Sequence, residues 1–353
     1  MQLIDIIIFI LVLSGLIIVH EFGHFITARL NHIRVDEFAI GFGKPIFRKK
    51  FKETFFLICM IPLGGYVKLA GDDRYRFKGG NDEFLSKPAG IRARVVIAGP
   101  LFNYLFSFII FWFIFIIGMP YLDNVIGGVM DNSPAQRIGL KAGDRVLEVN
   151  GRKVNTWTDI QGFIRKSKDD IELIILRGDE RLNFKIKPEY KEIKDIFGRE
   201  KSLPIIGIKS SMEIKEVKEN FFVAFIKAFN RTVELTIFIF QGLYYTIVGV
   251  IPFKESLAGP ITIFKLTSST AKEGVVALLH LVGVIGISLS IVNLFPIPVL
   301  DGGYLPLLFL EKIRKKPLSE KAEYILTRLG MVLIGVLVIL AFYSDILRIF
   351  SSK

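Results

Sequence analysis

The chain has 353 residues, of which 51% are hydrophobic and 23% charged, and its formal net charge is +12. This mixture excludes an ordinary soluble protein and favours membrane spans joined to a water-exposed domain. A basic chain could bind nucleic acid, but the Lys and Arg residues cluster beside apolar runs. They are therefore interpreted as topology signals and lipid headgroup contacts, and no nucleic-acid partner is expected.

Four apolar runs are long enough to cross a lipid bilayer as helices, which takes about 20 residues. The first, near residues 3–26, lacks the basic leader and the small-residue cleavage site of a signal peptide, so a retained span is expected. The others lie near residues 95–117, 275–295 and 329–349. The pattern predicts a multi-pass protein of the lipid bilayer.

Basic residues predict the orientation of these spans. Lys and Arg concentrate in residues 34–52 and again in residues 311–328. The positive-inside rule places both segments in the cytoplasm, and both chain ends outside. This topology requires zero or two crossings between the second and third spans. The apolar stretch 221–250, which also carries charges, is therefore expected to be an amphipathic helix at the outer membrane surface.

Between the first two spans, the sequence has the features of strands. Residues 37–71 are rich in Phe, Ile and Val and are interrupted by Gly and Pro, which predicts short strands and turns. This segment is apolar enough to enter the membrane edge. Irregular backbone can do so only where protein covers it or where it lines a wet cavity.

A separate domain is expected between the second and third spans. It alternates strand-like runs with turn signals and has one predicted helix, residues 156–166, with Thr156 as its N-cap. Its pattern SPAQRIGLKAGDRVLEVNGRKV resembles a PDZ domain, which binds peptide as an added strand. The chain has room for one such domain.

The expected fold is a polytopic α-helical membrane protein with about four transmembrane helices. It carries a membrane-associated β-rich segment and one extracytoplasmic PDZ-like α+β domain. The expected divisions are residues 1–118 (two spans and the β segment), 119–210 (PDZ-like), 211–274 (interfacial helices) and 275–353 (two spans).

The stretch VHEFGH at the inner end of the first span contains ionisable residues that are costly at bilayer depth. On a helix, His20 and His24 lie one turn apart, so both imidazoles can reach one zinc ion. Glu21 lies beside that face and can take a proton from zinc-bound water. Because placing a glutamate in a membrane span costs free energy, a chance occurrence of this metal-binding pattern is disfavoured.

Catalytic zinc usually has three protein ligands, so a third must come from elsewhere. His32 lies about 12 Å further along a continuing helix and beyond an expected break. His280 is expected at the opposite end of its span. Asp301 fits better, because NLFPIPVLDGG follows the third span at the depth expected for the two histidines. Its prolines end the helix, and its glycines allow a tight turn.

The segments VHEFGHFITARL, GFGKP, IPLGGYVKLAG, AGPLFN and NLFPIPVLDGG, in this order, resemble the site-2 protease family of intramembrane zinc metalloproteases. They are most similar to its RseP-type (regulator of sigma-E protease) members. The resemblance implies one Zn²⁺ per chain, with His20, His24 and Asp301 as ligands. It also implies that Glu21 is the catalytic acid/base.

Further roles are also implied by this resemblance. Asn293 is expected to hold the substrate backbone or the developing oxyanion, and the strands near Tyr66 and Val67 to pair with an unwound substrate. For Asn103, on the second span, two roles stay open: close helix packing and bracing of the zinc cavity.

The resemblance implies regulated intramembrane proteolysis in a bacterial cytoplasmic (inner) membrane, with the active site near the cytoplasmic side. The expected partners are single-span membrane proteins already trimmed on their outer side, such as an anti-sigma factor or a remnant signal peptide. Well-known Gram-negative members carry two tandem PDZ domains, so their way of screening substrates is not carried over to this chain.

Two other functional classes are disfavoured. A non-catalytic adaptor would be expected to lose Glu21 or a metal ligand first, and all of them are present. A metal-ion transporter has no need of a glutamate beside its transport ligands, and the spans show no internal repeat.

Overall fold

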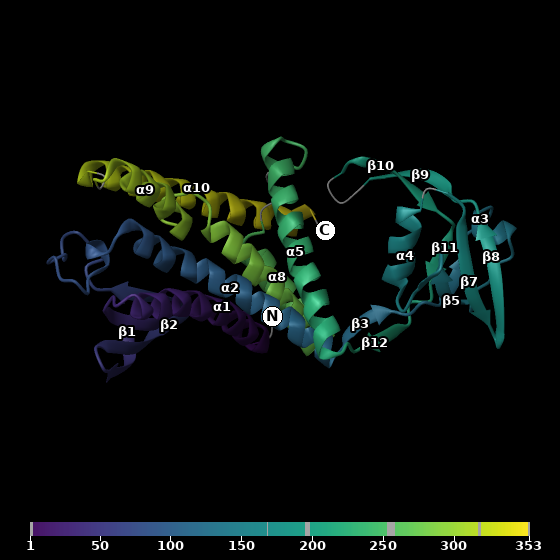
Figure 1. Cartoon of the computed structure of the whole chain (residues 1–353), viewed down its shortest axis with the longest axis horizontal. Coiled ribbons are helices and arrows are strands. Elements are labelled where there is room, and N and C mark those ends of the chain that lie inside the picture. The colour runs from purple at the N-terminus through teal and green to yellow at the C-terminus, as the bar shows by residue number, and fades with distance from the viewer. Residues whose placement is uncertain (1–2, 168, 195–197, 253–257, 317–318, 352–353) are drawn as a thin grey trace. The chain divides into compact units, whose positions relative to one another are not determined.

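The computed structural model of the chain describes residues 3–167, 169–194, 198–252, 258–316 and 319–351. The chain divides into two compact units (Figure 1). The first comprises Met1–Ile114, Ala224–Ile247 and Pro252–Lys353, and the second comprises Phe115–Val223 and Val248–Ile251.

Among the described residues, four helices are long and apolar enough to cross a membrane. They are α1 (Leu3–Leu30), α2 (Ala89–Ile117), α8 (Val275–Asn293) and α10 (Glu320–Ser351). Many of their large apolar side chains are exposed, as expected of helices that contact lipid rather than water. The four predicted apolar helices and their approximate positions are confirmed among the described residues.

The segment predicted to be amphipathic forms one long helix, α5 (Phe221–Ile247), which is not among the four candidate spans. In Figure 1 it runs steeply across α2 and α8. Its Phe225 ring packs against Trp112 of α2, with ring centroids 5.3 Å apart. Its Arg231 lies 3.2 Å from Nε2 of His280 on α8. These contacts fasten α5 to two candidate spans, and its location at the outer membrane surface stays a prediction.

Shorter helices complete the first unit. α7 (Pro260–Glu273) lies against α1 and α8, and its N-terminus contacts Asp345 of α10. α9 (Asp301–Arg314) follows the Pro-rich loop after α8. A single 3-10 turn, η1 (Phe84–Ser86), precedes α2.

The strands between α1 and α2 form one sheet. β1 (Val35–Phe51) and β2 (Thr54–Leu69) pair with each other, and register shifts divide both into shorter pieces. Residues 37–40 pair with residues 65–68 on one side and with residues 55–58 on the other. Strands in this segment are therefore confirmed, but β1 and β2 are 17 and 16 residues long rather than short. Residues 65–68 form an edge of the sheet, with no second partner strand among the described residues.

This sheet lies along α1 (Figure 1). The ring of Phe25 on α1 packs edge-on against Phe38 and Phe56, with ring centroids 5.5 and 5.9 Å apart. Nearer the N-terminus of α1, Ser14 Oγ donates a hydrogen bond of 2.6 Å to the carbonyl of Pro62. Together these contacts place the sheet beside the helical turn that carries His20, Glu21 and His24, the HExxH motif.

The second unit contains the predicted strand-rich domain. Its four-stranded sheet has the order β6-β5-β7-β8, and α4 packs its Trp157 and Ile160 into the core. Thr156 caps α4 as predicted, with Oγ1 accepting the Asp159 N–H at 3.2 Å. The elements are β4 (Ile126–Val129), α3 (Pro134–Arg137), β5 (Arg145–Val149), β6 (Arg152–Lys153), α4 (Trp157–Lys166), β7 (Ile171–Arg177), β8 (Glu180–Ile186), β9 (Glu189–Lys194), β10 (Glu200–Ile205) and β11 (Ile208–Ser210).

Strand pairing extends this unit past the expected end at residue 210. β12 (Ile214–Val217) pairs with β3 (Met119–Leu122). Because the two strands flank the whole domain in sequence, they join its beginning to its end. Residues 214–217 are therefore a strand of the second unit rather than part of the helical segment that follows.

Candidate active site

The HExxH turn lies where α1 and α2 approach closely. On α1, His20 Nε2 and His24 Nε2 are 3.1 Å apart, as the helical spacing predicts. Gly99 of α2 lies against both rings: a Cβ built there would be 2.8 Å from His20 Nε2 and nearer still to His24 Nε2. Gly23 similarly admits the backbone of Ala98. Small residues thus let the two helices touch where the imidazoles gather.

Asp301 completes the group from the first turn of α9. Its Oδ2 lies 2.9 Å from His20 Nε2 and 3.4 Å from His24 Nε2. The two glycines after Asp301 make this possible, because a Cβ on Gly302 or Gly303 would collide with the backbone of the preceding loop. The loop therefore folds tightly enough to bring the carboxylate to the histidines.

These three residues fit a catalytic zinc ion. One ligand atom from each lies within 4.8 Å of the other two. With bonds of about 2.0–2.2 Å and tetrahedral angles, zinc ligands lie about 3.4 Å apart, close to the separations of 2.9, 3.1 and 3.4 Å found here. Two nitrogens and one carboxylate oxygen leave a fourth position for water.

The outer hydrogen bonds of the two imidazoles differ. Nδ1 of His24 lies 2.8 Å from the carbonyl of Val95, which fixes Nε2 as the ligand atom. Nδ1 of His20 is buried and has no hydrogen-bond partner among the described residues. The alternative ligands do not join the group: His32 follows the end of α1 with φ of 55°, and His280 contacts Arg231.

A cavity of about 350 Å³ opens at this group. Tyr66 and Val67 line it from the edge strand, as expected, so the predicted substrate strand and the metal group face one space. Asn293, which ends α8, is not among the lining residues. The lining consists of His20, Glu21, His24, Tyr66, Val67, Leu69, Asp72, Phe84, Val95, Val96, Asp301 and Tyr304.

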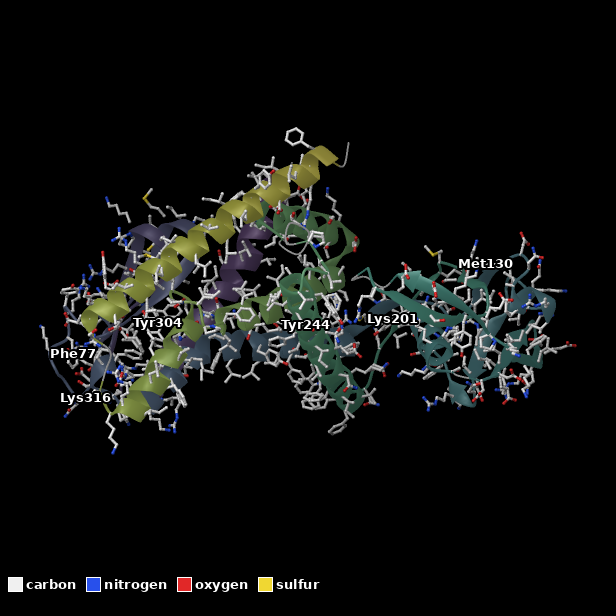
Figure 2. All side chains as sticks on the ribbon, turned by 90° about the horizontal axis from the view of Figure 1, so that it is seen from above. Phe77, Met130, Lys201, Tyr244, Tyr304 and Lys316 are labelled. Atoms are coloured by element: carbon white, nitrogen blue, oxygen red, sulfur yellow. The ribbon has the colours of Figure 1, made fainter. Side chains whose placement is uncertain are left out.

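Two polar residues of this cavity were not anticipated. Asp72 follows the motif IPLGGYVKLAG directly, and Tyr304 lies three residues after Asp301 on α9 (Figure 2). The spacing of Tyr304 from Asp301 along a helix is a signal that would have placed it on the same face. Asp72 lies in irregular backbone just after the turn at residues 70–71, where spacing carries no such information.

The edge strand contributes Tyr66 to the cavity lining, and Glu37 accepts a hydrogen bond of 2.8 Å from its hydroxyl. Burial, the hydrogen bond and the charge of Glu37 raise the pKa of Tyr66 to about 12. Burial also raises the pKa of Asp72, although the Leu69 N–H bonds its carboxylate. Tyr66 therefore stays protonated at neutral pH.

The second unit has a cavity of its own, also about 350 Å³. It lies between α4 and the segment 203–208, which includes the end of β10 and the start of β11. Its lining is mainly apolar, and the charged side chains in it are Arg165 and Lys191. A groove between a helix and a strand is the kind of site in which an extended peptide can bind.

Comparison with known proteins supports a peptidase active site at this metal group. Residues 8–337 match peptidase family M50. A protein of Campylobacter jejuni is 33% identical over 97% of this chain and 93% of its own length. The regulator of sigma-E protease RseP of Escherichia coli is 29% identical, covering 97% of this chain and 98% of that protein. The regulator of sigma-W protease RasP of Bacillus subtilis is 28% identical with the same coverage.

The alignment with the Escherichia coli protein runs over 447 positions, more than the 353 residues of this chain, so that relative contains insertions. Among solved structures, a PDZ domain from Listeria monocytogenes is 26% identical over 26% of this chain and 88% of its own length, with a TM-score of 0.21.

Proposed function

The chain belongs to peptidase family M50, the site-2 protease family of zinc metalloproteases, and we propose that it cleaves single-span membrane proteins within the bilayer or at its edge. One observation carries this proposal. His20, His24 and Asp301 gather beside Glu21 in a cavity, on or next to helices long enough to span a membrane. A metal group of this kind at membrane depth is a functional site rather than a packing feature.

His20, His24 and Asp301 would hold the zinc ion, with Val95 orienting His24. Zinc bound there would supply a water of lowered pKa and polarise the scissile carbonyl. Glu21 takes the proton of the attacking water and later gives it to the leaving amine. Its position at the cavity wall, directly after His20 in sequence and one turn from His24, suits both transfers.

The edge strand supports a route for substrate binding. A carbonyl in a helical span is hydrogen-bonded and shielded, so a substrate must unwind before it is cut. Residues 65–68 offer an unpaired strand edge along the same cavity, and an extended substrate would pair with it at Tyr66 and Val67. Asn293 ends α8, and the loop after it carries Asp301. From this position Asn293 would bind the backbone of the substrate.

The proposed location is a bacterial cytoplasmic membrane, with the second unit outside and the active site near the cytoplasmic side. The basic segments flanking the spans support this orientation. The names of the Escherichia coli and Bacillus subtilis relatives favour an anti-sigma factor as substrate, and a remnant signal peptide is the other candidate. The second unit would then exclude substrates whose outer part has not been trimmed.

Cleavage by the purified chain in liposomes tests the proposal. The substrate is a single-span reporter with a truncated outer part, and mass spectrometry of the products locates the cut relative to the span. Glu21→Gln is expected to keep zinc and lose cleavage by about 100-fold or more. Glu53→Gln, on the exposed tip of the sheet, is the matched control. Full cleavage by Glu21→Gln would falsify the acid/base assignment.

A further inference from the structure

Two buried polar groups beside the metal group lack partners. Nδ1 of His20 has none among the described residues, and neither does the oxygen or the nitrogen of the Asn103 carboxamide. Asn103 is 0% exposed and His20 is 8% exposed. Buried polar groups are nearly always hydrogen-bonded, and an unpaired one costs about 1–3 kcal/mol. One interaction that involves both His20 Nδ1 and the Asn103 carboxamide would explain both unpaired groups.

The packing of α1 against α2 and α8 places the two groups at neighbouring levels of the helices. Gly99 lies against His20, and Asn103 follows Gly99 by one helical turn on the same face of α2. One turn before His20 on α1 is Leu16. A Cβ built on Gly286 of α8 would lie 3.2 Å from Leu16 Cδ2 and 3.6 Å from the Asn103 carbonyl. Asn103 therefore lies between the levels of His20 and Leu16.

We infer that Asn103 is a positioning residue, whose carboxamide oxygen accepts a hydrogen bond from Nδ1–H of His20 through one bridging water molecule. This inference rests on the proposed zinc site. A neutral imidazole that ligates a metal through Nε2 carries its proton on Nδ1. That proton needs an acceptor, and in His24 the Val95 carbonyl serves this purpose. Asn103 gives His20 the matching acceptor.

This role differs from close helix packing. Packing requires volume at position 103, whereas orientation of His20 requires an acceptor. Outer acceptors of this kind fix the ring of a ligand histidine, and their loss weakens metal binding by about 10- to 100-fold. Asn103→Leu keeps most of the volume and removes the acceptor, and Asn103→Asp keeps an acceptor.

The experiment measures zinc affinity by chelator competition on the full-length chain in detergent. The visible absorption spectrum of the Co²⁺-substituted protein reports the ligand geometry. Asn103→Leu is expected to weaken zinc binding 10- to 100-fold and to change the Co²⁺ spectrum, while Asn103→Asp restores both. Ser107→Ala is the matched control, because Ser107 is also 0% exposed and lies one turn further along α2. It should bind zinc as the unmodified chain does.

Wild-type affinity and an unchanged Co²⁺ spectrum in Asn103→Leu would overturn the inference, as would equal weakening in Ser107→Ala. If Asn103→Leu does not fold, as judged by thermal unfolding, Asn103→Ala takes its place. Failure of the unmodified chain to bind zinc would instead refute the proposed metal site itself. The two failures are therefore distinguishable.

Discussion

Oδ2 of Asp301 lies 2.9 Å from Nε2 of His20, although the two residues belong to opposite ends of the chain. If this pair marks the metal site, Asp301→Ala should lower bound zinc from about one ion per chain to a small fraction, because one of three ligands is lost. Zinc per chain can be measured by mass spectrometry on protein purified in detergent.

The matched control for this variant is Asp72→Ala. Asp72 lines the same cavity, but it is not part of the three-residue ligand group. Its removal should leave the zinc content unchanged. Equal zinc in the Asp301→Ala variant and the unmodified chain would remove Asp301 from the ligand set.

Gly99→Ala should disrupt the metal group through a single methyl group. The added Cβ would lie 2.8 Å from His20 Nε2 and would collide with His24 Nε2. The added Cβ is fixed to the backbone of α2, which moves less easily than a side chain. The two imidazoles must therefore move away from the positions in which they can bind the metal. We expect zinc affinity to fall at least about 10-fold, with cleavage falling in parallel.

Gly90→Ala provides the comparison on the same helix. Apart from neighbouring residues of the same helix, no heavy atom of the described residues lies within 4 Å of a Cβ built on Gly90, so this variant should bind zinc normally. Chelator competition on both variants measures the difference. Normal zinc affinity in Gly99→Ala would show that the close approach of α2 does not shape the site.

The parts of the site that lie close together in sequence could be predicted. The spacing of His20 and His24 places them on one helical face, and the positive-inside rule puts Asp301 at their depth. The Phe, Ile and Val content of residues 37–71 indicated strands, which β1 and β2 confirm, although both are longer than the Gly and Pro interruptions suggested. The helical spacing and the turn residues are local information, whereas the depth of Asp301 follows from the basic segments that flank the spans.

Contacts between distant segments could not be predicted in this way. Nothing near Gly99 indicates that its missing side chain makes room for His20 and His24. The pattern around Gly259 indicates only a loop or a helix start, yet the acceptor for its N–H is Asp345 on α10. Such contacts depend on how helices pack, which local periodicity does not encode.

In the second unit, the pair Asp144 and Arg177 predicts a pH dependence. Both carboxylate oxygens accept from Arg177, at 2.7 and 2.8 Å, and one also accepts the Lys141 N–H at 2.8 Å. Burial alone would raise the pKa of Asp144, but the Arg177 and Lys141 interactions outweigh it and lower the pKa below the usual value near 3.8. The folded state therefore binds the proton more weakly than the unfolded chain does.

The stabilisation from this pair is present above the unfolded pKa of about 3.9 and is lost as the pH falls through the lower folded pKa. Asp144→Asn should reduce the free energy of unfolding at neutral pH by about 1–3 kcal/mol and flatten its decline at acid pH. Trp157, buried in this unit, allows fluorescence to follow unfolding. An unchanged acid decline in the variant would show that other groups cause it.

In the first unit, Asp345 lies in a candidate span and is 1% exposed. Its carboxylate accepts the N–H groups of Gly259, Ile261 and Thr262 at 3.1, 2.9 and 3.1 Å, and it also contacts the Thr262 hydroxyl. It thus pairs orphan donors at the start of α7 with a buried acceptor.

Asp345→Ala should therefore lower stability by about 3 kcal/mol or more, because several buried amides lose their acceptor at once. Asp345→Asn, which keeps one acceptor oxygen, should fall in between, and Ser344→Ala, at the buried neighbouring position, should change little. Thermal unfolding in detergent measures all three variants. Zinc per folded chain should stay at the wild-type level, since Asp345 is not in the ligand group. Unfolding of Asp345→Ala at the wild-type temperature would mean that α7 does not depend on this carboxylate.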